Sequence, residues 1–204
     1  MTGSRPSLLD LIVRDVRVQD AFLPVTFFLL VTVIATFAAG PDAALLQRIG
    51  PGFLWTGLLL AFLLPVADLF RRDRLSGVLD QHFVRGFAPE LVTFARTLSL
   101  WISVGVPLAA TSVPAGLLLN VPVGDVMVPL VTGSVALSAL AVAAGALVVG
   151  ARGGEAVASL IVLPLAAPIV IFGVGGDLRL LGAAAIFLLF LCPLAAGAAL
   201  RQLG

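Results

Sequence analysis

Residues 58–105, LLLAFLLPVADLFRRDRLSGVLDQHFVRGFAPELVTFARTLSLWISVG, decide the fold. Long apolar runs at both ends of this stretch enclose one charged segment, residues 68–96. Apolar runs of this length belong in lipid, and a charged segment between two of them must lie in water at a membrane face. We therefore expect a membrane protein that meets a soluble partner through this segment. Its charged residues and its histidine, the only one in the chain, are Asp68, Arg71, Arg72, Asp73, Arg74, Asp80, His82, Arg85, Glu90 and Arg96.

The composition of the whole chain agrees with a membrane protein. Of the 204 residues, 60% are hydrophobic and 11% are charged, with a mean hydropathy of +1.17, whereas a soluble domain carries about 25% charged residues. The net charge of +1 provides no basic face for nucleic acid. The single cysteine, Cys192, excludes an intrachain disulfide and a multi-cysteine metal site. We expect no cleavable signal peptide, because a polar segment precedes the first long apolar run.

Six apolar stretches are long enough to cross a bilayer as helices, which takes about 20 residues each. Their continuous apolar character argues against the alternating strands of a membrane β-barrel. Prolines within them do not argue against helix, because packed transmembrane helices satisfy the carbonyls that proline leaves free. The sequence thus predicts an all-α integral membrane protein with six spans, at residues 21–39, 51–69, 97–119, 126–149, 156–174 and 180–200.

The arginines predict the orientation, because positive residues are retained on the cytoplasmic side. Ten of the twelve fall on one side of the predicted spans, and only Arg48 and Arg179 fall on the other. We therefore expect both termini to be cytoplasmic, which an even number of spans also requires. The ten are Arg5, Arg14, Arg17, the five of segment 68–96, Arg152 and Arg201.

Residues 1–20 precede residues 21–204, which hold the six predicted spans, and they have a pattern of their own. Apolar residues recur at helical spacing from Ser7 to Ala21, with charged residues mostly on the opposite side. The pattern predicts an amphipathic helix in the cytoplasmic interface. The alternative is a solvated tail.

No catalytic constellation is present in the sequence. A phosphate-binding loop ending in lysine is excluded, because the chain has no lysine. His82 stands alone among charged loop residues, and such a histidine is most often solvated. The predicted span centres contain essentially no charge, which disfavours a proton-coupled or ion-coupled carrier. The energy for any transport must therefore come from a partner.

Within the cytoplasmic loop 70–96, residues 76–84 favour a short docking helix. Ser76 is a suitable N-cap, and Gly86 would end the helix before Pro89 and Glu90 start the next one. The alternative is an ordinary polar connector, although such a link between adjacent helices needs only about 2–8 residues. In the helix, Val78, Leu79, His82 and Phe83 would form one surface, leaving Asp80 and Arg85 exposed.

Several short motifs stand out along the chain: RIGPGFLW (48–55), LFRRD (69–73), GVLDQ (77–81), RGG (152–154), SLIVLPL (159–165), PI (168–169) and IF (171–172). Together they resemble the CcmB family, the haem exporter protein B permeases of cytochrome c maturation. The resemblance covers nearly the whole chain, with Trp101 at the start of the third predicted span. Asp80 stands where the family usually has Glu, Gly86-Phe87 replaces a more typical Pro-Leu, and the external loop near residues 175–179 is short.

The resemblance implies an ABC-2 type permease in the bacterial inner (plasma) membrane. Such a permease has no ATPase site of its own and works with a separate CcmA-type ATP-binding subunit. The family is further linked to CcmC-like and CcmD-like membrane proteins and to a haem chaperone, CcmE. No cofactor is expected to bind directly; ATP would act through the ATPase, and haem would be the transported or handled species. The implied ATPase-coupling residues are Ser76, Gly77, Val78, Leu79, Asp80, Gln81 and Phe83.

Two other functions remain open on the sequence alone. One is a related ABC-2 permease that exports a drug, lipid or polysaccharide, and the other is a membrane assembly factor that transports nothing. A homodimer is expected in either ABC case, because six helices are half of the usual ABC membrane core. Small residues at 141–150 and 195–199 would allow close helix contact.

Overall fold

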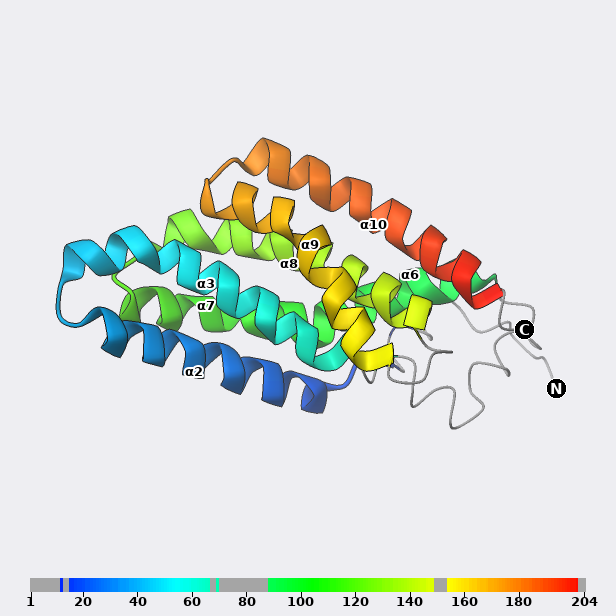
Figure 1. The fold of residues 1–204 in the computed structure, drawn as a ribbon, viewed down its shortest axis with the longest axis horizontal. Helices are drawn as coiled ribbons and strands as arrows, with labels where there is room; N and C mark the ends of the chain where they lie inside the picture. Colours follow the sequence, from blue (N-terminus) through cyan, green and yellow to red (C-terminus); the bar gives the residue numbers. More distant parts are fainter. Residues whose placement is uncertain (1–11, 13–14, 67–68, 70–87, 149–153, 202–204) are drawn as a thin grey trace.

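A computed structural model describes residues 12, 15–66, 69, 88–148 and 154–201. The described residues form helices and short turns, with no strand among them (Figure 1). A short 3₁₀ helix, η1 (Val18–Ala21), precedes the first long helix. The remaining elements are α2 (Phe22–Ala39), α3 (Ala43–Val66), α6 (Pro89–Leu100), the π-helical turn η2 (Trp101–Gly105), α7 (Val106–Leu118), α8 (Val123–Val148), α9 (Gly154–Val174) and α10 (Leu178–Arg201).

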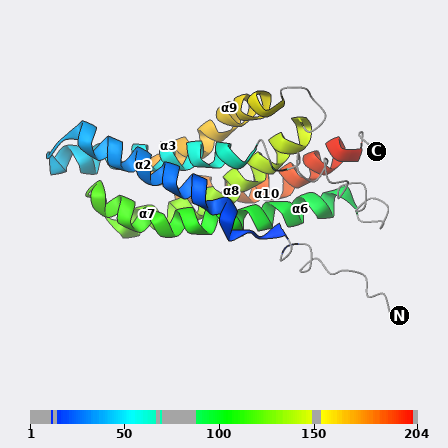
Figure 2. The same ribbon diagram turned by 90° about the horizontal axis from the view of Figure 1, so that it is seen from below.

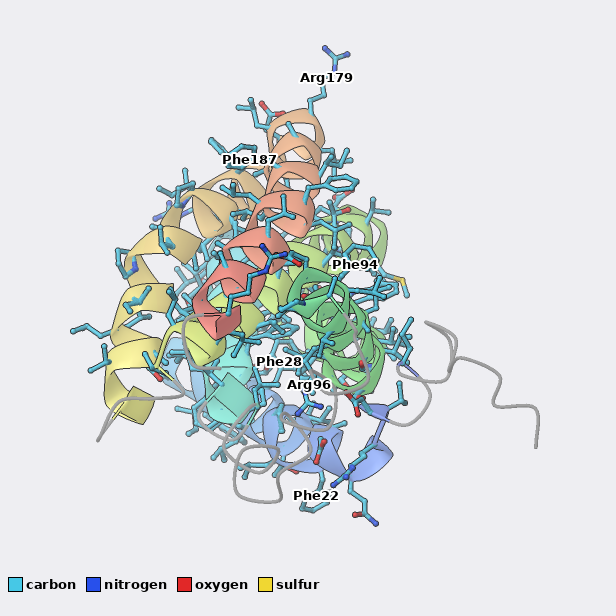
Figure 3. All side chains as sticks on the ribbon, turned by 90° about the vertical axis from the view of Figure 1, so that its right-hand side faces the viewer. Phe22, Phe28, Phe94, Arg96, Arg179 and Phe187 are labelled. Atoms are coloured by element: carbon cyan, nitrogen blue, oxygen red, sulfur yellow. The ribbon has the colours of Figure 1, made fainter. Side chains whose placement is uncertain are left out.

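Six helical stretches are long and apolar enough to cross a membrane, which confirms the predicted all-α fold and its six spans. The third is the longest, because α6, η2 and α7 run on without a break over 30 residues, Pro89–Leu118. The fifth and sixth spans are α9 and α10. Apolar side chains cover the outside: Phe22 and Phe187 are exposed, whereas Phe28 is fully buried (Figure 3).

Two spans, the second and the third, begin eight residues earlier than predicted. The second starts at Ala43 rather than residue 51, because Asp42 caps it: the carboxylate accepts hydrogen bonds from the backbone N–H groups of Ala44 and Leu45 at 3.0 and 3.1 Å. Pro51 therefore lies inside α3 instead of at its start. The third span starts at Pro89, where the sequence predicts a helix start, so α6 takes the last eight residues of the loop predicted over 70–96.

Helix α8 occupies the centre of the bundle, where it packs against α3, α7, α9 and α10 (Figure 2). Of its most apolar 18 residues, 72% are buried, compared with 28% in the first and fifth spans. Small side chains make this possible, because residues 136–146 are almost all alanine, serine, glycine, valine or leucine. The run 141–146 is buried against the chain's own helices, so it cannot form a dimer surface.

Trp55 of α3 fixes how three helices meet. Its indole is 1% exposed and rests against the backbone of Gly133 in α8 and of Gly173 in α9. A Cβ atom at either glycine would overlap the indole ring. The absence of side chains at the two glycines thus leaves the space that Trp55, the largest buried side chain among the described residues, fills.

Three tight turns close one end of the bundle, on the left in Figure 1. After α9, Gly176 adopts φ +72°, and the N–H of Asp177 bonds to the Phe172 carbonyl at 3.1 Å, a helix-ending pattern that left-handed glycine permits. The Asp177 carboxylate then caps α10, which makes this loop as short as predicted. The start of α6 and the end of α10 lie together at the opposite end (Figures 1 and 2).

The glycines around Trp55 give a stability prediction. Gly133→Ala or Gly173→Ala is expected to lower the free energy of unfolding by about 1–3 kcal/mol, because an added methyl must displace the indole. The measurement is the thermal unfolding midpoint of the purified protein in detergent micelles. Gly52→Ala is the control, since a Cβ there has no neighbour within 4 Å. Equal midpoints for Gly133→Ala and Gly52→Ala would contradict the packing described.

Candidate functional site at the start of α6

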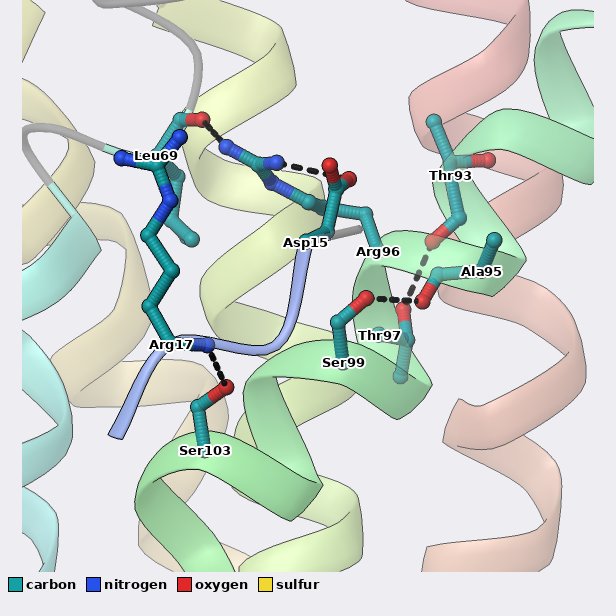
Figure 4. A network of polar contacts seen from close by, with 9 residues as sticks. All are labelled: Asp15, Arg17, Leu69, Thr93, Ala95, Arg96, Thr97, Ser99 and Ser103. Atoms are coloured by element: carbon teal, nitrogen blue, oxygen red, sulfur yellow. Dashed lines mark hydrogen bonds and ion pairs between the residues drawn. The ribbon is translucent and has the colours of Figure 1, made fainter. Parts of the chain in front are cut away.

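Four separate parts of the chain meet where the third span begins. Helix α6 begins at Pro89, the residue type favoured in a first helical turn, and Glu90 lies in that turn. Against it lie the N-terminal segment, Leu69 three residues beyond the end of α3, and the last turns of α10 (Figures 2 and 4). At this convergence, charged side chains join segments that are far apart in sequence.

Arg96 joins three of these parts. Its Nη1 lies 2.8 Å from Oδ2 of Asp15 in the N-terminal segment, and its Nη2 donates to the backbone carbonyl of Leu69 (Figure 4). The side chains of Arg96 and Asp15 are only 16% and 18% exposed. A guanidinium can serve both acceptors at once because its N–H groups point in fixed, divergent directions.

A second contact holds the N-terminal segment further along the same span. The backbone N–H of Arg17 donates to Oγ of Ser103, at 3.2 Å, and Ser103 belongs to the π-helical turn η2 (Figure 4). In η2 the ring of Trp101 covers Gly105, and its Nε1–H donates to Oγ of Ser134 in α8, at 3.0 Å. The wide turn is therefore anchored both to the central helix and to the N-terminal segment.

Buried hydroxyls line α6 and are satisfied within the protein. Thr97 and Ser99 donate to the carbonyls one turn earlier, those of Thr93 and Ala95, at 3.0 and 2.6 Å (Figure 4). Thr93 also reaches across to α10, with its Oγ1 2.7 Å from the carbonyl oxygen of Pro193. These hydroxyls serve helix packing, because hydrogen bonds to carbonyls of the helices satisfy them in an apolar environment.

Helix α10 approaches α6 closely. Gly197 faces the backbone of Glu90, where an added Cβ would lie 2.7 Å from the Glu90 nitrogen. One turn further on, Arg201 pairs with the Glu90 carboxylate at 2.8 Å, although the arginine side chain is 62% exposed. Such an exposed pair contributes little stability. The close backbone contact and the Thr93 bond hold the two helices together.

Arg96 lies within the third span but near its end. Thirty residues rise about 45 Å at 1.5 Å each, whereas the hydrocarbon core is about 30 Å thick, so the first turns of α6 extend out of it. In the described ranges, the charged residues of the span helices lie within eight residues of a helix end, as Arg48 and Asp125 do. The charges thus cluster at the ends of the spans, as expected from the sequence.

The family model described as CcmB protein matches residues 7–202 of the chain. The chain belongs to the CcmB family. Proteins named heme exporter protein B match it over nearly their full length. The one from Bradyrhizobium diazoefficiens is 38% identical over 96% of this chain and 98% of its own, and the one from Paracoccus denitrificans 36% identical over 94% and 97%. The Escherichia coli K12 protein is 34% identical over 87% and 88%.

The predicted ATPase-coupling residues of this CcmB-family protein, Ser76–Phe83, lie outside the described residues, as does His82. The structure describes the two flanks of their segment, Leu69 and Ala88–Pro89. The described chain contains no cluster of three His, Cys, Asp or Glu side chains that would hold a metal ion. Residues 1–11 and 13–14 of the predicted N-terminal amphipathic helix also lie outside the described residues. In the described part, Arg17 has an extended backbone and is followed by η1.

Sequence reasoning missed the pairing of Arg96 with Asp15. It placed Arg96 at the end of a solvated segment and Asp15 on the polar face of an interfacial helix. One signal was available, because Arg96 is the only basic residue from Pro89 to Leu118. A single arginine in an apolar helix calls for a carboxylate partner.

The contact between α6 and α10 gives a second stability prediction. Gly197→Ala is expected to separate the two helices locally and to lower the thermal unfolding midpoint in detergent, because the new methyl meets Glu90 backbone that cannot yield as a flexible side chain would. Gly182→Ala in the same helix has open space around its Cβ and should leave the midpoint unchanged or slightly raised. A smaller effect at 197 than at 182 would refute the close approach.

Proposed function

We propose that this chain is the membrane permease subunit of an ABC complex that acts in haem export for cytochrome c biogenesis. The observation that carries the proposal is the match of residues 7–202 to the CcmB model, together with full-length relatives named heme exporter protein B. The six apolar helices support a permease. Haem is the species that the complex handles, either as its cargo or on a chaperone that ATP hydrolysis releases.

The proposal requires a partner that supplies energy. The chain has no lysine for a phosphate-binding loop, and the described charges sit at the ends of the spans rather than along a pathway through them. We propose a CcmA-type ATPase as that partner. CcmC-like and CcmD-like membrane proteins and a CcmE-like chaperone would complete the system, with two copies of this chain forming the membrane core.

The end of the bundle that carries the start of α6 is proposed to be cytoplasmic, in the bacterial inner membrane. Arg17, Arg96 and Arg201 lie at this end, whereas Arg48 and Arg179 belong to the end with the three tight turns (Figure 1). Positive residues are retained on the cytoplasmic side. Leu69 and Pro89 are also at this end, so the segment between them leaves from and returns to the face where an ATPase is available.

The proposed mechanism converts closure of the ATPase subunits into movement of helices. Residues 76–83 would seat on the ATPase and pass its movement to α3 through Leu69 and to α6 through Pro89. Moving a two-state permease from about 1% to 99% in one state takes roughly 5.5 kcal/mol of differential binding. ATP-driven dimerisation of the ATPase subunits is the kind of event that supplies such a difference in binding free energy.

The proposal predicts the outcome of one double substitution. Leu79→Asp with Phe83→Asp should abolish co-purification of the chain with a co-expressed CcmA-type ATPase, because two carboxylates would enter an apolar contact. In a strain that lacks the native gene, the wild-type chain should restore haem-stained c-type cytochromes, and the double variant should not.

The matched control for this experiment is Arg85→Gln, which changes charge in the same segment outside residues 76–83. It should retain both the ATPase and the cytochromes. Retention of the ATPase by the double variant would refute the coupling assignment. Failure of the wild-type chain to restore c-type cytochromes, while it still binds the ATPase, would favour a permease for another substrate.

A further inference from the structure

We propose that Arg96 is a positioning residue that holds the N-terminal segment and the chain just beyond α3, at Leu69, to α6, so that these three parts move as one body. The inference rests on the proposed function for the source of that movement, the partner ATPase. Arg96 itself touches neither the ATPase nor any cargo in this account. It acts through Asp15 and Leu69.

The contacts of Arg96 span large distances in sequence. Asp15 is 81 residues away and Leu69 is 27 residues away, yet both accept hydrogen bonds from one guanidinium (Figure 4). The Arg17 bond to Ser103, 86 residues apart, fixes the N-terminal segment at a second point about two helical turns along the same span. Two separated attachments prevent the segment from pivoting about either one.

The low exposure of the pair makes the loss of either partner costly. Because the side chains of Arg96 and Asp15 are only 16% and 18% exposed, water screens the pair little, and replacing either residue takes an opposite charge away from a poorly solvated place. The Arg201–Glu90 pair on the same helix is more exposed, with 62% of the arginine side chain in contact with solvent. Of these two ion pairs, the Arg96 pair is therefore the more buried.

The position of the Arg96 bonds along the chain determines what they would do during coupling. The proposed coupling segment begins just beyond Leu69, three residues after the end of α3, and it joins α6 at Pro89. The Arg96 side chain of α6 donates to the Leu69 carbonyl, so it ties the point where the segment begins to the helix where it ends. A push on the segment is then delivered to α3, α6 and the N-terminal segment together. The close α6–α10 contact at Gly197 carries it on to the last span. Without Arg96, α3 and the N-terminal segment would be free to lag behind α6.

The first test uses the permease alone. Spin labels on cysteines at Gln19 and Ala88, both exposed, in a Cys192→Ser background report the distance between the N-terminal segment and α6. Arg96→Gln, Asp15→Arg and Arg96→Asp should each broaden this distance distribution, whereas Arg201→Gln should not. The reversed pair, Asp15→Arg with Arg96→Asp, should narrow it again, which general misfolding would not do. An unchanged width in Arg96→Gln, or no recovery in the reversed pair, would overturn the proposal.

The second test uses the complex with its ATPase. Arg96→Lys and Asp15→Asn are the variants expected to fold best, because each substitution keeps one polar contact. Both should retain the ATPase but lower the yield of c-type cytochrome per purified complex by about fivefold or more, the usual scale of coupling between sites. The reversed pair should recover only part of the yield, because a carboxylate at position 96 cannot donate to the Leu69 carbonyl. Wild-type yield per complex in Arg96→Lys and Asp15→Asn would overturn the proposal.

The two tests separate failure of this inference from failure of the proposed function. If the wild-type chain does not retain the ATPase, the proposed function fails, while the label distances still decide whether Arg96 holds the N-terminal segment. If the wild-type chain retains the ATPase and restores cytochromes, the Arg96 and Asp15 variants alone decide the inference.

Discussion

Lipid cannot hydrogen-bond to a peptide group, and the rest of the structure follows from that constraint. Each backbone polar group within the hydrocarbon core must be satisfied inside the chain, which leaves the helix as the solution seen here. The same need explains why Thr97 and Ser99 bond back to their own helix and why Asp42 and Asp177 cap helices as soon as the chain leaves the core. The hydrocarbon core also confines charged residues to the helix ends, where Arg96 pairs with the carboxylate of Asp15.

The two ends of the bundle are built differently. At one end, helices are joined by short turns such as 175–177, and left-handed Gly40 and Gly176 allow the chain to reverse there. Because these turns are short, a displacement of one helix at this end must also displace the helix that it is joined to. At the other end, the Arg96 side chain and the close backbone contact of Gly197 with Glu90 join parts of the chain that are far apart in sequence.

Much of the fold was predictable from the sequence, because length and apolar character alone identify a membrane span. The six spans, the helix start at Pro89 and the short turn before α10 were all confirmed. The start of α3 was missed, since Gly50-Pro51-Gly52 reads as a break in water but lies inside a helix here. The seat of Trp55 on Gly133 and Gly173 and the pairing of Arg96 with Asp15 depend on which helices become neighbours, and hydrophobic periodicity does not carry that information. The coupling residues 76–83 stay a prediction.

The proposed account requires the start of α6 to face the cytoplasm, and topology tests this most directly. In a Cys192→Ser background, single cysteines at Ala88, Asp42 and Asp177, all exposed, are treated with a membrane-impermeant maleimide in intact spheroplasts. The account predicts reaction at positions 42 and 177 in intact spheroplasts, and reaction at position 88 only after the membrane is opened. Reaction at position 88 in intact spheroplasts, with positions 42 and 177 protected, would contradict it.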